Sequence, residues 1–255
     1  MARVKAALAA RDGLVQIAVV LVAVAAYEAL RAMMTPDWPR ALQNAREVAS
    51  IERMLGIDWE STIQQRFLAV PSVVELFNLF YFVGHFLLSS LFLIWLYRTS
   101  RDGFRLFRDM FLFATAIAVF VHWAYPTAPP RLAGVGLKDT LLAFWNLDIG
   151  SPEFHGWSNP VAAVPSLHAA WAFAVAIGLV RYGGRVLRVA GIVYAPLVVL
   201  TIVVTGNHFI VDAAAGLMVL LAGFAAAFLV RGRPRRSSGG NGAILEPATR
   251  GGAVR

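Results

Sequence analysis

The residues best suited to chemistry in this sequence are two histidines, an aspartate and an arginine near the ends of apolar segments. His208 and Asp212 stand four residues apart, so on a helix the carboxylate can accept one imidazole N–H and leave the other nitrogen basic. That nitrogen could attack phosphorus, while His168 could protonate the leaving oxygen in the same step. Arg131 follows two prolines that stiffen its loop, and its guanidinium could contact two phosphate oxygens. This pattern predicts phosphoryl transfer.

A predicted helix start adds a possible anion site. Pro165 suits the first position of a helix, where its missing N–H costs nothing, and the amides of Ser166, Leu167 and His168 would then be unpaired. A helix N-terminus of this kind binds phosphate. We therefore assign Ser166 to the substrate-binding residues, together with Asn207.

Three further polar residues, Asn78, Tyr81 and His85, share one face of a long apolar segment. They either line the substrate cavity or only form hydrogen bonds between helices, and the sequence does not separate these two interpretations. All three are included among the candidate substrate-binding residues.

The histidines also allow other interpretations. A His–Asp pair four residues apart is often only structural, although His168 and Arg131 on the same side favour a functional site. Two histidines and one carboxylate could instead bind zinc, but a neighbouring Arg131 would oppose a cation. We predict no metal and no cofactor. The chain contains no cysteine, which excludes disulfides and thiolate ligands.

The composition predicts that membrane helices position these residues. The chain has 255 residues, of which 58% are hydrophobic and 15% charged, and its mean hydropathy is +0.64. The net charge of +8 does not indicate a nucleic-acid partner, because the basic residues form short clusters between apolar runs. Apolar runs long enough to cross about 30 Å of hydrocarbon must be helical. We predict an all-α, polytopic membrane protein with six transmembrane helices: Leu14–Met34, Val73–Tyr97, Phe107–Tyr125, Val164–Tyr182, Val186–Thr205 and His208–Val230.

The segments outside these runs differ in composition. The first run has an alternative as a cleaved signal peptide, because Ala23-Val24-Ala25 resembles a cleavage site. Apolar residues at helical spacing between Arg40 and Leu68 predict an amphipathic helix on the membrane surface. The Arg-, Ser- and Gly-rich residues 231–255 predict a disordered basic tail. The expected domains are an N-terminus over 1–13, a six-span domain over 14–230 and this tail.

The distribution of Lys and Arg predicts the orientation of the chain. With six spans, fourteen of these residues fall on one side and six on the other, where the loops are longer. The side with more positive charge is cytoplasmic, so both termini are expected in the cytoplasm. The segments with Arg131, His168 and His208 all map to the opposite side. We expect a multi-pass protein of the cell membrane with an extracytoplasmic site.

Two of these segments resemble signature motifs of a known family. Pro-Ser-Leu-His at Pro165–His168, followed forty residues after its histidine by His208-x-x-x-Asp212, is similar to the second and third motifs of the type 2 phosphatidic acid phosphatase and haloperoxidase superfamily. The resemblance covers roughly Asn78 to Gly223 and extends to the spacing and the six spans. It implies that His208 is transiently phosphorylated, that Asp212 orients it, and that His168 is the general acid and later the base.

Departures from the family pattern point to one branch of it. Ala124 stands where the first motif has Lys, and Leu132 follows Arg131 where that motif has Pro. Thr201 and Ile202 replace the Ser-Arg that begins the third motif, so two phosphate-binding cations are missing. The pattern of Pro-Thr-Ala-Pro-Pro-Arg, Pro-Ser-Leu-His and Gly-Asn-His-x-x-x-Asp is instead similar to the inositol phosphorylceramide synthase and sphingomyelin-type synthase branch. Members of this branch move a phospho-alcohol head group between lipids. Further resemblance to bacterial members of this branch lies in Glu52, Trp59-Glu60 and Asn78-x-x-Tyr81-x-x-x-His85.

The resemblance implies an inositolphosphotransferase-like, metal-independent lipid phosphotransferase that acts through a phosphohistidine. The alternative is a lipid phosphate phosphatase that hydrolyses phosphatidic acid or a prenyl diphosphate. An alternative of another class is a lipid or solute transporter, because polar residues such as Glu28 and Arg31 lie within the apolar runs. The expected partners are the membrane and a lipid phosphate or phospholipid substrate, with no nucleic acid and no obligate protein partner.

Overall fold

The computed structural model describes residues 2–151 and 159–231. In these residues every regular element is a helix, and the β-bridge between Thr127 and Ala162 is isolated, which confirms the all-α prediction. The predicted disordered tail, residues 231–255, lies outside the described residues except for Arg231. Arg231 belongs to the last helix, and its guanidinium forms an ion pair with Asp109.

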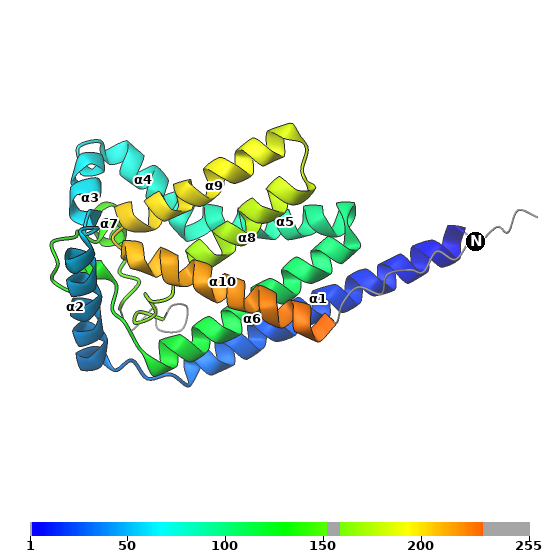
Figure 1. Cartoon of the computed structure of the whole chain (residues 1–255), viewed down its shortest axis with the longest axis horizontal. Coiled ribbons are helices and arrows are strands. Elements are labelled where there is room, and N and C mark those ends of the chain that lie inside the picture. Colours follow the sequence, from blue (N-terminus) through cyan, green and yellow to red (C-terminus); the bar gives the residue numbers. More distant parts are fainter. Residues whose placement is uncertain (1, 152–158, 232–255) are drawn as a thin grey trace, which may run out of the picture.

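Long helices run alongside one another, and shorter ones lie at one end of them (Figure 1). Figure 1 shows α2 crossing this end, while α1 extends away in the other direction. The elements are α1 (Ala2–Ala32), α2 (Trp38–Leu55), α3 (Glu60–Leu68), α4 (Pro71–Leu79), the π-helical segment η1 (Phe80–Gly84), α5 (His85–Thr99), α6 (Arg101–Ala124), the 3-10 turn η2 (Pro130–Leu132), α7 (Thr140–Trp145), α8 (Leu167–Tyr182), α9 (Arg185–Val204) and α10 (Ile210–Arg231).

Among the described residues, four segments are long and apolar enough to cross a membrane: Arg11–Ala32, Pro71–Thr99, Arg185–Val204 and Ile210–Arg231. They correspond to four of the six predicted spans. The other two predicted spans are helical, as α6 and α8, but are not among these four. The α8 helix has only 16 residues, and α6 carries five charged residues among its first nine. The structure thus supports a multi-pass protein with four candidate spans.

The amphipathic segment between Arg40 and Leu68 forms two helices rather than one. Gly56 ends α2 in the left-handed conformation at φ 67°, which a glycine adopts without strain, and α3 starts at Glu60. One face of α2 is buried against the protein, where the Asn44 side chain donates to the Pro126 carbonyl at 2.7 Å. Of the apolar residues in this segment, Val48 is buried, whereas Ile51, Met54 and Leu55 are exposed, so contact of the helix with the membrane surface stays a prediction.

Small residues let α10 approach α8 and α6 closely. A Cβ atom on Gly216 would lie 2.4 Å from the Ser166 carbonyl oxygen, and one on Gly223 would lie 2.8 Å from the Ala114 nitrogen. Backbones can come this close only where side chains are small. The start of α10 is therefore held against the start of α8, which brings the segments of His208 and His168 together.

Candidate active site

His208 and Asp212 form the predicted pair at the start of α10. The His208 Nδ1 atom lies 2.9 Å from the Ala163 carbonyl oxygen and 3.1 Å from Asp212 Oδ2. A carbonyl oxygen can only accept, so Nδ1 carries the hydrogen and donates to both oxygens. In the neutral ring this leaves the lone pair on Nε2, which is the nitrogen that could react.

The loop between α9 and α10 fixes the position of His208. Gly206 takes a φ of 73° that suits glycine, and a Cβ there would meet the Lys138 carbonyl oxygen at 2.7 Å. The backbone amides of Asn207 and His208 both donate to the Ile202 carbonyl, at 3.1 and 3.2 Å. His208 lies outside α9 and α10, and its burial lowers the pKa of the imidazole to about 4. The ring is therefore neutral at pH 7, as a nucleophile must be.

His168 faces His208 from the first turn of α8. The centroids of the two rings are 5.8 Å apart. The Tyr81 ring stacks on His168 at a centroid distance of 4.4 Å and an angle of 15°. The Nε2 atom of His168 is buried and has no hydrogen-bond partner among the described residues. The structure thus brings the two predicted histidines together and leaves one polar atom of His168 unused.

The predicted anion site at the start of α8 differs from the structure. The helix begins at Leu167, and Ser166 is its N-cap, whose hydroxyl accepts from the Ala169 amide at 3.3 Å. The Ser166 amide donates to the backbone carbonyl of Asp212 at 3.0 Å. Expecting Pro165 at the first helical position was wrong, because the serine cap delays the helix by two residues. Ser166 connects α8 to α10 and does not offer a free amide.

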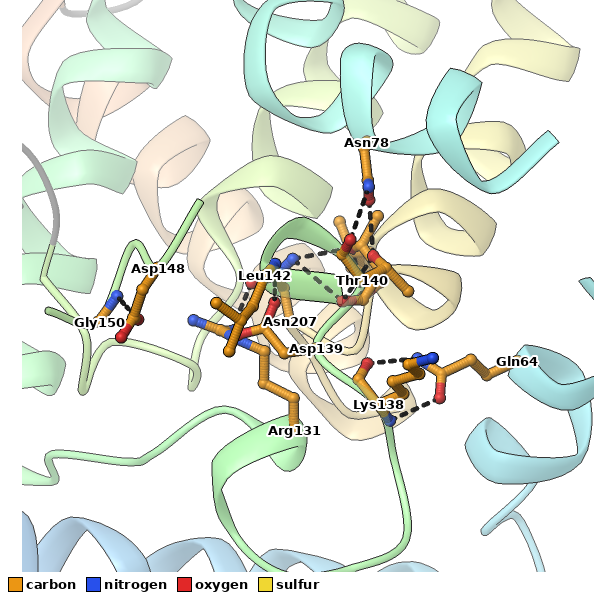
Figure 2. A network of polar contacts seen from close by, with 12 residues as sticks. Gln64, Asn78, Arg131, Lys138, Asp139, Thr140, Leu142, Asp148, Gly150 and Asn207 are labelled. Carbon is orange, nitrogen blue, oxygen red and sulfur yellow. Dashed lines mark hydrogen bonds and ion pairs between the residues drawn. The ribbon is translucent and has the colours of Figure 1, made fainter. Parts of the chain in front are cut away.

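The side chains of Arg131 and Asn207 lie close together (Figure 2), and Asn207 directly precedes His208 in the loop between α9 and α10. Arg131 Nε donates to Asp139 Oδ2 at 2.7 Å, and its Nη1 donates to the Asn207 side-chain oxygen. The Arg131 side chain is only 3% exposed. No partner for its Nη2 occurs among the described residues, so this nitrogen is available to a phosphate oxygen. The structure brings both predicted binding residues to the site.

The other three candidate binding residues have different surroundings. Figure 2 shows that Asn78 is bound to Thr140, whose hydroxyl donates to Asn78 Oδ1 at 2.6 Å. The Asn78 amide donates back to the Thr140 carbonyl at 3.0 Å, so this residue joins α4 to α7. His85 Nδ1 lies 2.9 Å from the Tyr194 hydroxyl, and its ring is 5.1 Å from that of His168. Of these three residues, Tyr81 and His85 contact the histidine site directly.

Several residues support the site without having been assigned to it from the sequence. His122 contacts the segment before α8, where its Nε2 donates to the Pro165 carbonyl at 3.1 Å. Gln64 accepts from the Lys138 amide at 2.8 Å and donates to the carbonyls of Lys138 and Val204. A lone histidine or glutamine gives no periodic signal, so the sequence did not reveal either role.

Two buried glutamates reach the first turn of α10. Glu60 Oε1 accepts from the Ile210 amide at 2.9 Å, and Glu52 Oε1 accepts from the Val211 amide at 2.8 Å. Asp212 Oδ2 takes the preceding amide, that of Phe209, at 2.9 Å. In the sequence these two glutamates stand out only by their resemblance to bacterial members of the family branch, and Glu52 shares the buried face of α2 with one other polar residue, Asn44. Three carboxylates thus accept hydrogen bonds from three successive backbone amides at the start of α10.

In the described part of the chain, no group of three or more His, Asp or Glu is arranged to hold an ion. Two histidines and a carboxylate are present, but His208 Nδ1 is already bonded to Asp212 and Ala163. The chemistry available to the described residues is attack by a histidine nitrogen, proton transfer by a second histidine and charge stabilisation by an arginine.

The fold and the site together define a helical protein with several membrane-compatible helices and a histidine pair beside an arginine. The sequence model of the PAP2 superfamily matches residues 46–226. This range covers more than half of the chain, so the protein belongs to the PAP2 superfamily. Neither the curated proteins nor the solved structures with which the chain was compared gave a match. Membership indicates a phosphatase or phosphotransferase and does not favour the transporter alternative.

Proposed function

We propose that this protein is an integral membrane lipid phosphotransferase in which His208 is the nucleophile, Asp212 orients it, and His168 is the general acid and base. The observation that carries the proposal is the pair of bonds from His208 Nδ1 to the Ala163 carbonyl and to Asp212, which leaves Nε2 as the reactive atom. The short distance between the two histidine rings, 5.8 Å, supports a shared substrate.

The reaction balances with these residues alone. In the first step the His208 Nε2 lone pair forms a bond to phosphorus, and the bond from phosphorus to the leaving oxygen breaks as His168 donates a proton to that oxygen. In the second step the acceptor hydroxyl attacks phosphorus and gives its proton to His168, and the P–N bond breaks. Arg131 Nη2 can contact a non-bridging phosphate oxygen throughout.

The missing cations support transfer of a phospho-alcohol group, as in the inositol phosphorylceramide synthase-like branch. Ala124 and Ile202 stand where the superfamily motifs have Lys and Arg. A phosphodiester adduct on His208 carries one negative charge fewer than a monoester adduct, so fewer cations are needed around it. Hydrolysis of a lipid phosphate is the second candidate, since water could replace the acceptor hydroxyl.

The proposal includes six membrane spans, both termini in the cytoplasm and an extracytoplasmic site. The asymmetry of Lys and Arg supports this orientation. The start of α10, which follows His208, lies at the end of the bundle that α2 crosses, which agrees with a site toward one membrane face (Figure 1). Tyr81, His85 and Asn207 are proposed to contact or position the substrate, whereas Asn78 is proposed to act through Thr140.

The test is incubation of the purified protein with labelled phosphatidic acid, prenyl diphosphate, phosphatidylinositol and ceramide, followed by product identification. The proposal predicts a new phosphodiester lipid, formed in the presence of EDTA and inhibited by vanadate, which mimics five-coordinate phosphorus. Release of inorganic phosphate alone would favour the phosphatase. Loss of activity on chelation and its recovery with Zn²⁺ would reject the histidine mechanism.

A further inference from the structure

The first turn of α10 is held by two side chains that come from far away in the sequence. Glu60 and Glu52 accept from the amides of Ile210 and Val211, across 150 and 159 residues. Helix starts are usually capped by a neighbouring Ser, Thr, Asp or Asn. Here Glu52 of α2, which is 1% exposed, and Glu60 of α3, which is 3% exposed, bind the turn that carries Asp212. Any shift of either glutamate would therefore move the partner of His208.

The charge of this pair is unusual. Each carboxyl group bonds to one of two successive amides, so the two groups are neighbours, and neither forms an ion pair among the described residues. The charged groups that face Glu52 are Glu60 from α3 and Asp212 from α10. Burial, and then the neighbouring Glu60, raise the pKa of Glu52 to about 9. Asp212 Oδ1 is also buried and lacks a partner in the described structure.

We propose that Glu52 and Glu60 are positioning residues for the histidine nucleophile, and that they share one proton while they hold the first turn of α10. This inference rests on the proposed function. A single shared proton keeps one negative charge, rather than two, beside Asp212. An anionic phosphate must approach His208, so loss of that proton places a second negative charge near its path. The pair thus fixes the geometry of the site and makes its charge depend on pH.

The proposal distinguishes two substitutions of Glu52. Glu52→Gln keeps an oxygen that can accept from Val211 and places an NH₂ group beside Glu60, as the shared proton does. Its kcat at pH 7 should stay within about threefold of the wild type, because one hydrogen bond replaces another. Glu52→Ala removes the bond, and kcat should fall about 10- to 100-fold with a smaller change in KM, because misplacement of His208 mainly affects the chemical step.

The pH dependence provides the decisive readout. Turnover of the wild type should decline above about pH 9, and Glu52→Gln should lack this decline. Glu47→Gln is the matched control, since Glu47 lies on the exposed face of the same helix, and it should decline like the wild type. An unchanged alkaline decline in Glu52→Gln, or full kcat in Glu52→Ala, would overturn the proposal.

A second measurement does not depend on turnover. A carboxyl group with a raised folded-state pKa stabilises the fold fully below its unfolded pKa, and this stabilisation is lost as pH rises toward the folded pKa. The melting temperature of the full chain in detergent should therefore fall for the wild type relative to Glu52→Gln between about pH 5 and about pH 9. If the melting temperatures of the wild type and Glu52→Gln change in parallel with pH, the shared proton is rejected. The expected melting difference without turnover on any substrate would instead reject the proposed function, and with it the catalytic role of the pair.

Discussion

The tautomer of His208 decides which of its nitrogen atoms can react. The Ala163 carbonyl requires a hydrogen on Nδ1, and Asp212 adds a second acceptor for it. Asp212 in turn accepts from the Phe209 amide at 2.9 Å, so the carboxylate and the imidazole are fixed relative to each other. At this scale the site is an oriented nucleophile with a second histidine ring 5.8 Å away.

The roles of the two histidines can be distinguished with substrates that differ in their leaving group. His208→Ala removes the atom that forms the adduct, so turnover should vanish with every substrate. His168→Ala removes the proton donor, which should cost about 10²- to 10⁴-fold with an alkoxide leaving group but much less with a nitrophenolate, which needs little protonation. Stopped-flow release of nitrophenolate measures the rate of the first step. The rate of Asp212→Asn should lie between those of His208→Ala and His168→Ala. Equal losses in both histidine variants with the activated substrate would contradict the division of roles.

The sequence predicted the polar partners unevenly. The i, i+4 spacing of His208 and Asp212 predicted their bond correctly, although His208 precedes α10 and reaches Asp212 from the loop rather than from the helix. The pairing of Asn78 with Thr140 depends on how α4 packs against α7, 62 residues further on, and no local pattern carries that information. For the same reason the sequence left open whether Asn78 lines a cavity or joins two helices.

At the scale of the elements, the site depends on the contact between α8 and α10. Hydropathy located both helices, but it placed the start of α8 too early, since the side chain of Ser166 ends the extended segment and caps the helix. Hydropathy also could not divide the amphipathic segment, whose break at Gly56 depends on backbone conformation. The approach of α10 to α8 requires Gly216, whose absent side chain leaves room for the Ser166 carbonyl.

Gly216→Val should separate these helices. Its Cβ would lie 2.4 Å from the Ser166 carbonyl oxygen, and backbone cannot move aside as a flexible side chain can. We expect a loss of about 1 to 3 kcal/mol in stability and a loss of turnover of about 10²-fold from misplacement of about 1 Å. Thermal unfolding and turnover in the same detergent measure both effects. Gly184→Ala is the control, because no atom lies within 4 Å of its Cβ position, and wild-type behaviour of Gly216→Val would contradict the close contact.

At the scale of the whole molecule, the site and the basic clusters lie toward opposite ends of the bundle. Lys138 shortly precedes α7, which lies at the end that α2 crosses, whereas Arg101 and Arg105 belong to the first turns of α6, which follows the connection from α5 at the opposite end (Figure 1). Asp12 of α1 forms ion pairs with both of these arginines, at 3.2 and 3.4 Å. Such clusters are typical of the cytoplasmic ends of membrane helices.

The proposed orientation can be tested by labelling, because the chain contains no cysteine. Lys138→Cys, near the site, should react with an impermeant maleimide added to intact cells. Asp102→Cys, whose parent side chain is 97% exposed at the opposite end, should react only after the cells are opened. Labelling of both variants in denatured protein controls for thiol reactivity. The opposite pattern would place the site on the cytoplasmic face.

The mechanism requires a covalent bond between His208 Nε2 and phosphorus, and this adduct can be trapped. The protein is mixed with a phosphate-labelled lipid, quenched at alkaline pH, where phosphohistidine is more stable than in acid, and the modified peptide is identified by mass spectrometry. We expect the label on His208 in the wild type, a larger trapped fraction when the acceptor alcohol is omitted, and no label in His208→Ala. Phosphate on another residue, or turnover without an adduct in any variant, would contradict the mechanism.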